Sequence, residues 1–219
     1  AAIESQPFIP ILLGGNLGAY STARSFYEAY KVTSLVLCTM VTGPIDHSIF
    51  IEPIVEPKMM QPGVLINLLN DLDKRYPNTK KILLASTDNA VELVINHKTR
   101  FPNDWIIPYV DKETFYHATN KASFYEICEK EGVPYPKTLV IKEYEPHLPF
   151  DFPIIIKPTD SMKYHSIDFL GKEKVYICED PSSYKKIIQD MKDNGYDDDI
   201  ILQEYIPGDD SLVGVATVY

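Results

Sequence analysis

An apolar segment that runs into paired glycines constrains the fold of this 219-residue chain most strongly. Residues Phe8–Leu13 are continuously apolar and end at Gly14-Gly15, a pattern typical of a buried parallel strand followed by a turn. A helical stripe of apolar side chains follows, and residues 32–39 form a second apolar, β-branched run. Because strand, helix and strand at this spacing open a doubly wound sheet, residues 1–111 are predicted to form an α/β domain with a parallel sheet.

Further elements of this first domain follow from the same patterns. Residues 82–85 are predicted to form a strand, and Asn89 with Glu92 three residues later predicts a capped helix start. Residues 105–110 are predicted to form another strand, which Pro108 breaks or ends.

A second unit is predicted over residues 112–219. A helix over residues 121–130 precedes short apolar strands, and Asp180-Pro181 predicts a capped helix start. The predicted strands are residues 138–141, 153–157, 174–178 and 199–206. Strands in hairpin-like order around one long helix favour an α+β subdomain.

Charge and cysteine content exclude several classes of function. The chain carries 31 acidic and 21 basic residues, a formal net charge of −10, which argues against a general nucleic-acid binder. No apolar run is long enough for a transmembrane helix, and no signal peptide is expected. The three scattered cysteines, Cys38, Cys128 and Cys178, predict reduced thiols in a cytoplasmic protein and no zinc site.

Three segments could carry chemistry. The glycine-containing turn 14–18 could approach an anion, although a tight structural turn is the simpler interpretation. Lys157 ends a buried strand, where an ammonium must reach either water or an anion. Residues 203–210 run from a strand into a hinge and two carboxylates, which could meet a purine edge and a ribose or form an ordinary acidic turn.

Taken in order, these segments resemble the ATP-grasp superfamily. The resemblance rests on Asn120-Lys121, then Gly132-Val133-Pro134-Tyr135-Pro136, then Ile154-Ile155-Ile156-Lys157-Pro158, then Gln203-Glu204-Tyr205-Ile206-Pro207-Gly208. It implies that residues 1–111 are a Rossmann-like pre-ATP-grasp domain and that residues 112–219 are the amino-terminal, incomplete part of the ATP-grasp domain. It also implies that Lys121 and Lys157 hold ATP phosphates, that Gln203, Glu204, Tyr205 and Ile206 line the adenine, and that Asp210 holds the ribose.

The sequence is similar in particular to carboxylate–amine ligases of the D-aspartate ligase type. The likeness includes Pro10-Ile11-Leu12-Leu13-Gly14, Ala23-Arg24-Ser25-Phe26, Ser123-Phe124-Tyr125-Glu126 and Ile206-Pro207-Gly208-Asp209-Asp210-Ser211. Such enzymes use ATP to join D-aspartate, through an acyl-phosphate intermediate, to a peptidoglycan precursor. Arg24 is then a candidate for binding a substrate carboxylate, with a surface arginine as the simpler interpretation. The amine acceptor and the oligomeric state are left open.

Two departures from the family pattern bear on activity. Residues 159–166, where relatives carry several glycines, contain none. The resemblance places the magnesium ligands and the catalytic residues beyond Tyr219, so no metal site is expected within this chain. Residues 212–219 are predicted to begin an apolar strand, and the chain is interpreted as a truncated piece that is inactive alone. The alternatives are a non-catalytic nucleotide-binding or regulatory module and a dinucleotide enzyme, whose glycine fingerprint is missing.

Overall fold

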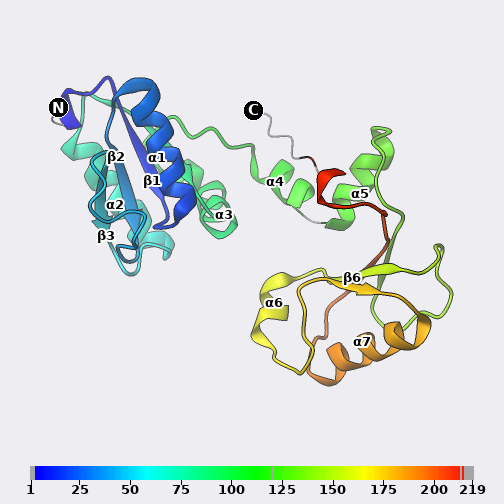
Figure 1. Cartoon of the computed structure of the whole chain (residues 1–219). Helices are drawn as coiled ribbons and strands as arrows, with labels where there is room; N and C mark the ends of the chain where they lie inside the picture. Colours follow the sequence, from blue (N-terminus) through cyan, green and yellow to red (C-terminus); the bar gives the residue numbers. More distant parts are fainter. Residues whose placement is uncertain (1–2, 120, 213, 215–219) are drawn as a thin grey trace. The chain divides into compact units, whose positions relative to one another are not determined.

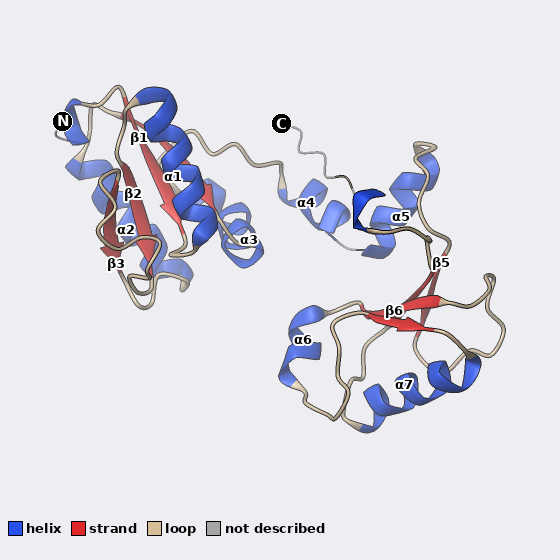
Figure 2. Ribbon diagram, viewed as in Figure 1, coloured by secondary structure: helices blue, strands red, loops and turns tan. Residues whose placement is uncertain are grey.

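The computed structural model describes residues 3–119, 121–212 and 214, without the side chains of residues 121–123, 161, 162 and 210. The chain divides into two compact units, residues 1–116 and 117–219. Each unit contains its own sheet and helices (Figures 1 and 2). The division falls inside helix α4 (Lys112–Thr119), a few residues after the boundary predicted at 111.

The first unit is built on a four-stranded parallel sheet. Its strands are β1 (Phe8–Leu13), β2 (Ser34–Cys38), β3 (Ile51–Val55) and β4 (Lys80–Ala85), in the order β3-β2-β1-β4. Its helices are α1 (Leu17–Tyr30), α2 (Pro62–Arg75) and α3 (Asp88–His97), with short 3-10 turns at Ile3–Ser5 and Lys98–Arg100. The predicted α/β unit with a parallel sheet is therefore confirmed.

Both faces of this sheet are covered. Leu13 belongs to the large core beneath α2 and α3, whereas its neighbour Leu12 packs with Ala19 and Ala23 of α1 on the other face. Consecutive residues of a strand point to opposite faces, so a continuous apolar run is what a doubly covered sheet requires.

The second unit has a four-stranded antiparallel sheet. Its strands are β5 (Thr138–Ile141), β6 (Ile154–Pro158), β7 (Tyr176–Cys178) and β8 (Ile200–Glu204), in the order β5-β8-β6-β7. Its helices are α5 (Lys121–Lys130), α6 (Ser161–Ser166) and α7 (Pro181–Asp193), with a 3-10 turn at Asp210–Leu212. The predicted α+β subdomain is confirmed.

The two faces of this second sheet differ. Ile154, Ile156 and Leu202 point into a core that includes Tyr184, Ile188 and Met191 of α7. The opposite face carries Lys157 and Gln203, and on β7 it leaves Ile177 56 % exposed. Helix α7 begins as predicted, because the Asp180 carboxylate accepts hydrogen bonds from the backbone N–H groups of Ser182 and Ser183.

Several local predictions are wrong. Residues 105–110 form a single bridge, Ile82 with Ile106, because Pro108 cannot donate to a continuing ladder. Helix α3 is capped by Thr87 rather than Asn89, which lies inside the helix. Helices α4 and α6 were not predicted. Of the predicted terminal strand, Leu212 lies in a 3-10 turn, and residues 213 and 215–219 lie outside the described residues. None of the described helices has the length and apolar character to cross a membrane.

Candidate functional site

The side chains of Lys157 and Gln203 meet on the less covered face of the second sheet. Lys157 pairs with Ile201 and Gln203 pairs with Ile155, so the two residues are diagonal neighbours on adjacent strands β6 and β8. The Lys157 Nζ donates a hydrogen bond to Gln203 Oε1 across 2.5 Å. The structure thus brings together the lysine and the first hinge residue that the sequence predicts for one nucleotide site.

Gln203 is buried and fully hydrogen-bonded. Its amide nitrogen donates to the hydroxyl of Tyr125 on α5 across 2.6 Å and to Thr138 Oγ1 on β5 across 2.7 Å. Only 5 % of the residue is exposed, so each bond replaces a contact with water that the side chain cannot make. Four elements of the second unit, α5, β5, β6 and β8, therefore contribute to this site.

The charge of Lys157 meets a neutral partner. Its ammonium is bonded to an amide oxygen, and burial lowers the pKa of Lys157 below its usual value. A partly desolvated cation bonded to a neutral amide still attracts an anion, because the bond does not cancel its charge. This arrangement suits a phosphate better than it suits a structural ion pair.

Glu204 is held on the other side of β8. Its carboxylate accepts a hydrogen bond from the Lys137 N–H across 2.9 Å, and its own N–H donates to the Lys137 carbonyl across 3.0 Å. These bonds fix the end of β8 against the segment that enters β5. The hinge then continues through half-buried Tyr205 to Ile206, which is 65 % exposed.

A cavity of about 520 Å³ adjoins this hinge. Glu204, Tyr205, Lys137 and residues 148–153 line it, and Lys157 is not among its lining residues. Glu204 points away from the sheet face that carries Gln203 and Lys157. The cavity and the contact between Lys157 and Gln203 are therefore separate features of the hinge.

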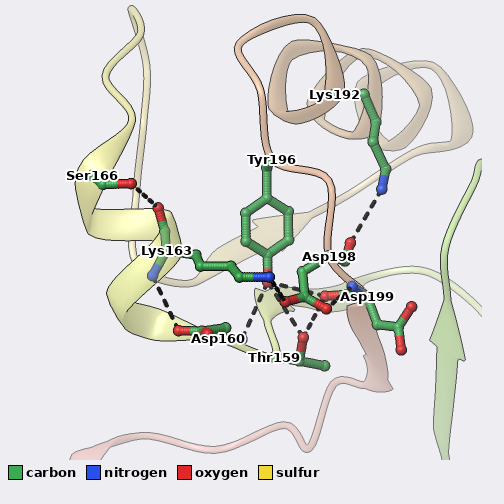
Figure 3. Close-up of polar contacts among 8 residues, drawn as sticks. All are labelled: Thr159, Asp160, Lys163, Ser166, Lys192, Tyr196, Asp198 and Asp199. Carbon is green, nitrogen blue, oxygen red and sulfur yellow. Dashed lines mark hydrogen bonds and ion pairs between the residues drawn. The ribbon is translucent and has the colours of Figure 1, made fainter.

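The segment after Lys157 is folded and bonded to the loop that precedes β8 (Figure 3). Thr159 Oγ1 donates to the Asp199 carbonyl across 2.7 Å, and the Asp160 N–H donates to the Tyr196 hydroxyl across 3.2 Å. Lys163 on α6 forms an ion pair with Asp198 across 2.8 Å. Residues 159–166, where relatives carry several glycines, thus contain the short helix α6, which hydrogen bonds and an ion pair hold in place.

The neighbouring aromatic side chains hold α6 further. The Tyr164 and Tyr176 hydroxyls lie 2.5 Å apart, and the Tyr164 ring meets the Tyr196 ring edge to face with centroids 5.4 Å apart. Burial and then the Tyr176 hydroxyl raise the pKa of Tyr164. Tyr164 is 3 % exposed, so it anchors this segment in the core.

Two of the remaining predicted side chains lie outside the described structure, and the third belongs to the first unit. The side chains of Lys121 and Asp210 lie outside the described part of the structure, although Lys121 begins α5 as the sequence predicts. Arg24 belongs to the first unit, where its guanidinium forms an exposed ion pair with Glu28 across 2.7 Å. That pair favours the simpler interpretation of Arg24 as a surface residue.

Sequence reasoning missed Tyr125 and Thr138. In the sequence, Tyr125 stands out only as part of the family-like string 123–126, and Thr138 only as the start of a predicted strand. Their contact with Gln203 joins residues 78 and 65 positions apart, a separation that no local pattern encodes. Within the described ranges, no group of three or more His, Cys, Asp or Glu side chains is placed to hold a metal ion.

Comparisons with known proteins agree with the sequence motifs. No protein-family model matches the chain. The chain is 37 % identical over 228 aligned residues to D-aspartate ligase from Enterococcus faecium (strain Aus0004), an alignment that covers 100 % of this chain and 54 % of that protein. It therefore spans about half the length of the curated relative it matches. The predicted resemblance to the D-aspartate ligase group is confirmed.

Solved structures extend the likeness to the fold. An L-amino acid ligase from Bacillus licheniformis matches with a TM-score of 0.61 at 11 % identity, covering 93 % of this chain and 45 % of that one. The N5-carboxyaminoimidazole synthetase from Staphylococcus aureus, complexed with ADP, matches with a TM-score of 0.60 at 11 % identity, covering 91 % and 48 %. Both are ATP-grasp ligases, and these matches show a shared fold.

Proposed function

Because this chain is related along its whole length to a D-aspartate ligase and has the fold found in ATP-grasp ligases, we propose that it contributes the nucleotide-binding part of an ATP-dependent carboxylate–amine ligase. In this proposal Lys157 binds a phosphate group of ATP. Gln203 and Glu204 line the adenine, and Tyr205 and Ile206 offer it backbone groups. Lys121 and Asp210 are proposed for a phosphate and the ribose on the strength of their sequence positions alone.

The observation that carries the proposal is the ammonium of Lys157, bonded to the neutral side chain that begins the hinge. A half-buried cation that is bonded to a neutral amide rather than to a carboxylate is costly in a structural role, and an anionic ligand would offset that cost. Its position one strand away from Gln203 puts the charge next to the segment proposed to hold the base.

The proposed chemistry has two steps. The γ-phosphoryl group of ATP moves to an oxygen of the substrate carboxylate, which releases ADP and leaves an acyl phosphate. An amine then attacks the acyl carbon, the C–O bond to phosphate breaks, and the amine loses a proton to give an amide. Lys157 would stabilise the negative charge on the phosphates throughout, by a preorganised electrostatic contact.

Magnesium belongs to the proposal as the ion that neutralises the phosphates. The resemblance places its ligands beyond Tyr219, and in the described ranges no group of three or more His, Cys, Asp or Glu side chains is placed to hold a metal ion. We therefore assign no step of the chemistry to a metal held by this part of the chain.

The substrate assignment is the finer part of the proposal. We infer D-aspartate, or another amino acid, as the carboxylate donor and a peptidoglycan precursor as the amine acceptor; the relative's name supports the former, and the resemblance implies the latter. A cytoplasmic location is proposed with it, and it is consistent with Cys38, Cys128 and Cys178 all being free thiols.

The test is binding of ADP by calorimetry to the chain and to Lys157→Ala. We expect the substitution to weaken binding at least tenfold, whereas Lys186→Ala, which removes an exposed lysine from α7, should leave binding unchanged. Equal affinity in the Lys157→Ala variant would refute the proposed site.

A second assay separates the ligase from the alternative of a non-catalytic nucleotide-binding module. ADP release by the full-length gene product is measured with D-aspartate, L-aspartate and other amino acids in turn. Release that depends on one amino acid supports the ligase. If the protein binds ADP but no amino acid stimulates the conversion of ATP to ADP, the non-catalytic module is favoured.

A further inference from the structure

Gln203 forms hydrogen bonds with Lys157, Tyr125 and Thr138, and it thereby links the last two residues to the Lys157 ammonium. We propose that Gln203 is a positioning residue for the Lys157 ammonium, and that Tyr125 and Thr138 fix the orientation of its amide. This inference rests on the proposed function only for its consequence in nucleotide binding. The positioning itself can be measured in the protein without nucleotide.

Thr138 determines the orientation of the Gln203 amide. Its hydroxyl donates to the Pro136 carbonyl across 2.7 Å, so its single proton is already used. Its oxygen can then only accept, and the Gln203 amide nitrogen supplies the proton across 2.7 Å. If the amide turned over, Gln203 Oε1 would face the lone pairs of Thr138.

Lys157 enforces the same orientation from the other end. An ammonium has donors only, so it requires the amide oxygen, which it contacts across 2.5 Å. A turned amide would place its NH₂ group against the ammonium. Thr138 and Lys157 therefore select one orientation independently, and a rotated Gln203 would lose both bonds.

Tyr125 completes the set. Its hydroxyl accepts the second amide proton across 2.6 Å, so both donors of the buried amide are used. Tyr125 lies on α5, whereas Thr138, Lys157 and Gln203 lie on three strands of the sheet. Helix α5 is thereby connected to Lys157 through a single intervening side chain, that of Gln203.

Neutrality of Gln203 is the second half of the inference. Among the described hydrogen bonds, Gln203 links the Lys157 ammonium to Thr138 on β5 and Tyr125 on α5, and of these two only Tyr125 carries a titratable group. An amide oxygen directs the ammonium but leaves its charge uncancelled. A carboxylate at the same place would direct it equally well and compete with a phosphate for it.

The first experiment compares two tyrosine variants. Tyr125→Phe removes the hydroxyl that accepts from Gln203, and we expect ADP binding to weaken about fivefold, the effect of one net hydrogen bond. Tyr135→Phe is the matched control, because the Tyr135 ring stacks on Tyr125 with centroids 5.2 Å apart while its hydroxyl lies beside Glu129. Equal affinities of the two variants would overturn the role of Tyr125.

The second experiment measures Lys157 directly, without nucleotide. In protein labelled with ¹³C at lysine Cε, the Lys157 signal is assigned with Lys157→Arg, and its titration midpoint is followed. Gln203→Glu should raise the midpoint, because a carboxylate stabilises the ammonium, and Gln203→Met should lower it, because the acceptor is lost. An unchanged midpoint in both variants would overturn the positioning role.

The two proposals fail in different ways. If the wild-type chain binds no ADP but the Lys157 midpoint moves as expected, the proposed function fails and the positioning role stands. If ADP binding depends on Lys157 but the Lys157 titration midpoint is the same in wild type and both Gln203 variants, the positioning role fails and the proposed function stands. Gln203→Glu that binds ADP as tightly as wild type at neutral pH would overturn the argument from neutrality.

Discussion

One lysine in each sheet of this protein forms a hydrogen bond to another side chain, and the two lysines, fully buried Lys81 and half-buried Lys157, have different partners. Lys81 on β4 has a fully buried side chain, and its ammonium lies 2.8 Å from an oxygen of Asp73, which also accepts from the Trp105 indole across 2.7 Å. Lys157 on β6 faces the neutral amide of Gln203 instead. The first charge is cancelled within the fold, whereas the amide bonded to the second leaves its charge uncancelled.

The sheets around the two lysines differ in the same way. The parallel sheet of the first unit is covered on both faces, so a charge within it must be paired by the protein itself. The antiparallel sheet of the second unit has one face less covered, where a cation can meet a bound anion. The comparison teaches that the partner of a lysine in a sheet, more than its burial, determines whether its charge is cancelled within the fold.

The largest expected effects test the difference between the sheets. Leu12→Ala and Leu13→Ala act on opposite faces of β1, and each should lower the free energy of unfolding by about 2–5 kcal/mol because both faces are core. In the second unit Ile154→Ala should have a similar cost, whereas Ile177→Ala should change stability by less than about 0.5 kcal/mol. Urea unfolding measures all four; equal costs for Ile154 and Ile177 would break the comparison.

The next effect concerns the structural lysine. Asp73→Asn leaves the Lys81 ammonium buried without a counter-charge and should cost about 3 kcal/mol. Asp71→Asn is the control, since Asp71 pairs with Lys74 at an exposed site. A loss as small as that of the control would mean that the Lys81 charge is tolerated unpaired.

The Asp73 pair also predicts a pH dependence. Burial alone would raise the pKa of Asp73, but hydrogen bonds from Lys81 and Trp105 outweigh it and hold the pKa below its usual value. The pair therefore contributes stability above the unfolded pKa near 4, and that stability is lost as the pH falls through the lower folded value. Unfolding followed from pH 7 to pH 2 should show this loss in wild type but not in Asp73→Asn.

A smaller effect tests the segment that follows Lys157. Tyr196→Phe removes the hydroxyl that accepts from the Asp160 N–H and donates to the Asp199 carbonyl, and should cost about 1 kcal/mol. Amide hydrogen exchange should rise in residues 159–166. Tyr184→Phe, an equally buried tyrosine whose hydroxyl meets Glu145, should instead raise exchange near residue 145. The same exchange pattern in both variants would argue against a specific anchor for α6.

The smallest effect on stability is expected at Lys157, the lysine proposed to bind a phosphate. Burial lowers the pKa of Lys157 below its ordinary value of 10.5, so its ammonium opposes folding at neutral pH. Wild type should gain stability as the pH rises through the folded pKa toward 10.5, and Lys157→Met should not. A wild type that loses stability relative to Lys157→Met over this range would show that the ammonium stabilises the fold.

Much of the fold could be predicted from local patterns. The apolar runs at β1 and β6 and the Asp180-Pro181 cap were recognised because burial, periodicity and backbone satisfaction act within a few residues of one another. The incorrect strand at residues 105–110 has an apolar composition too, but only its tertiary position shows that a single bridge to Ile82 forms. Helix α6 escaped prediction because Tyr164 is held by contacts with Tyr176 and Tyr196, which are distant in sequence.

The sequence by itself determined the two fold classes, the strands β1 and β6, the lysine near the end of β6, and the motifs that relate the chain to its relatives, because all of these depend on residues that are neighbours along the chain. Only the tertiary structure decided what those residues do to one another. It placed Lys157 in contact with Gln203, Gln203 in contact with Tyr125 and Thr138, and Lys81 in contact with Asp73. The charge of a lysine is a property of the residue, but whether that charge is cancelled depends on which side chains the fold brings within about 3 Å.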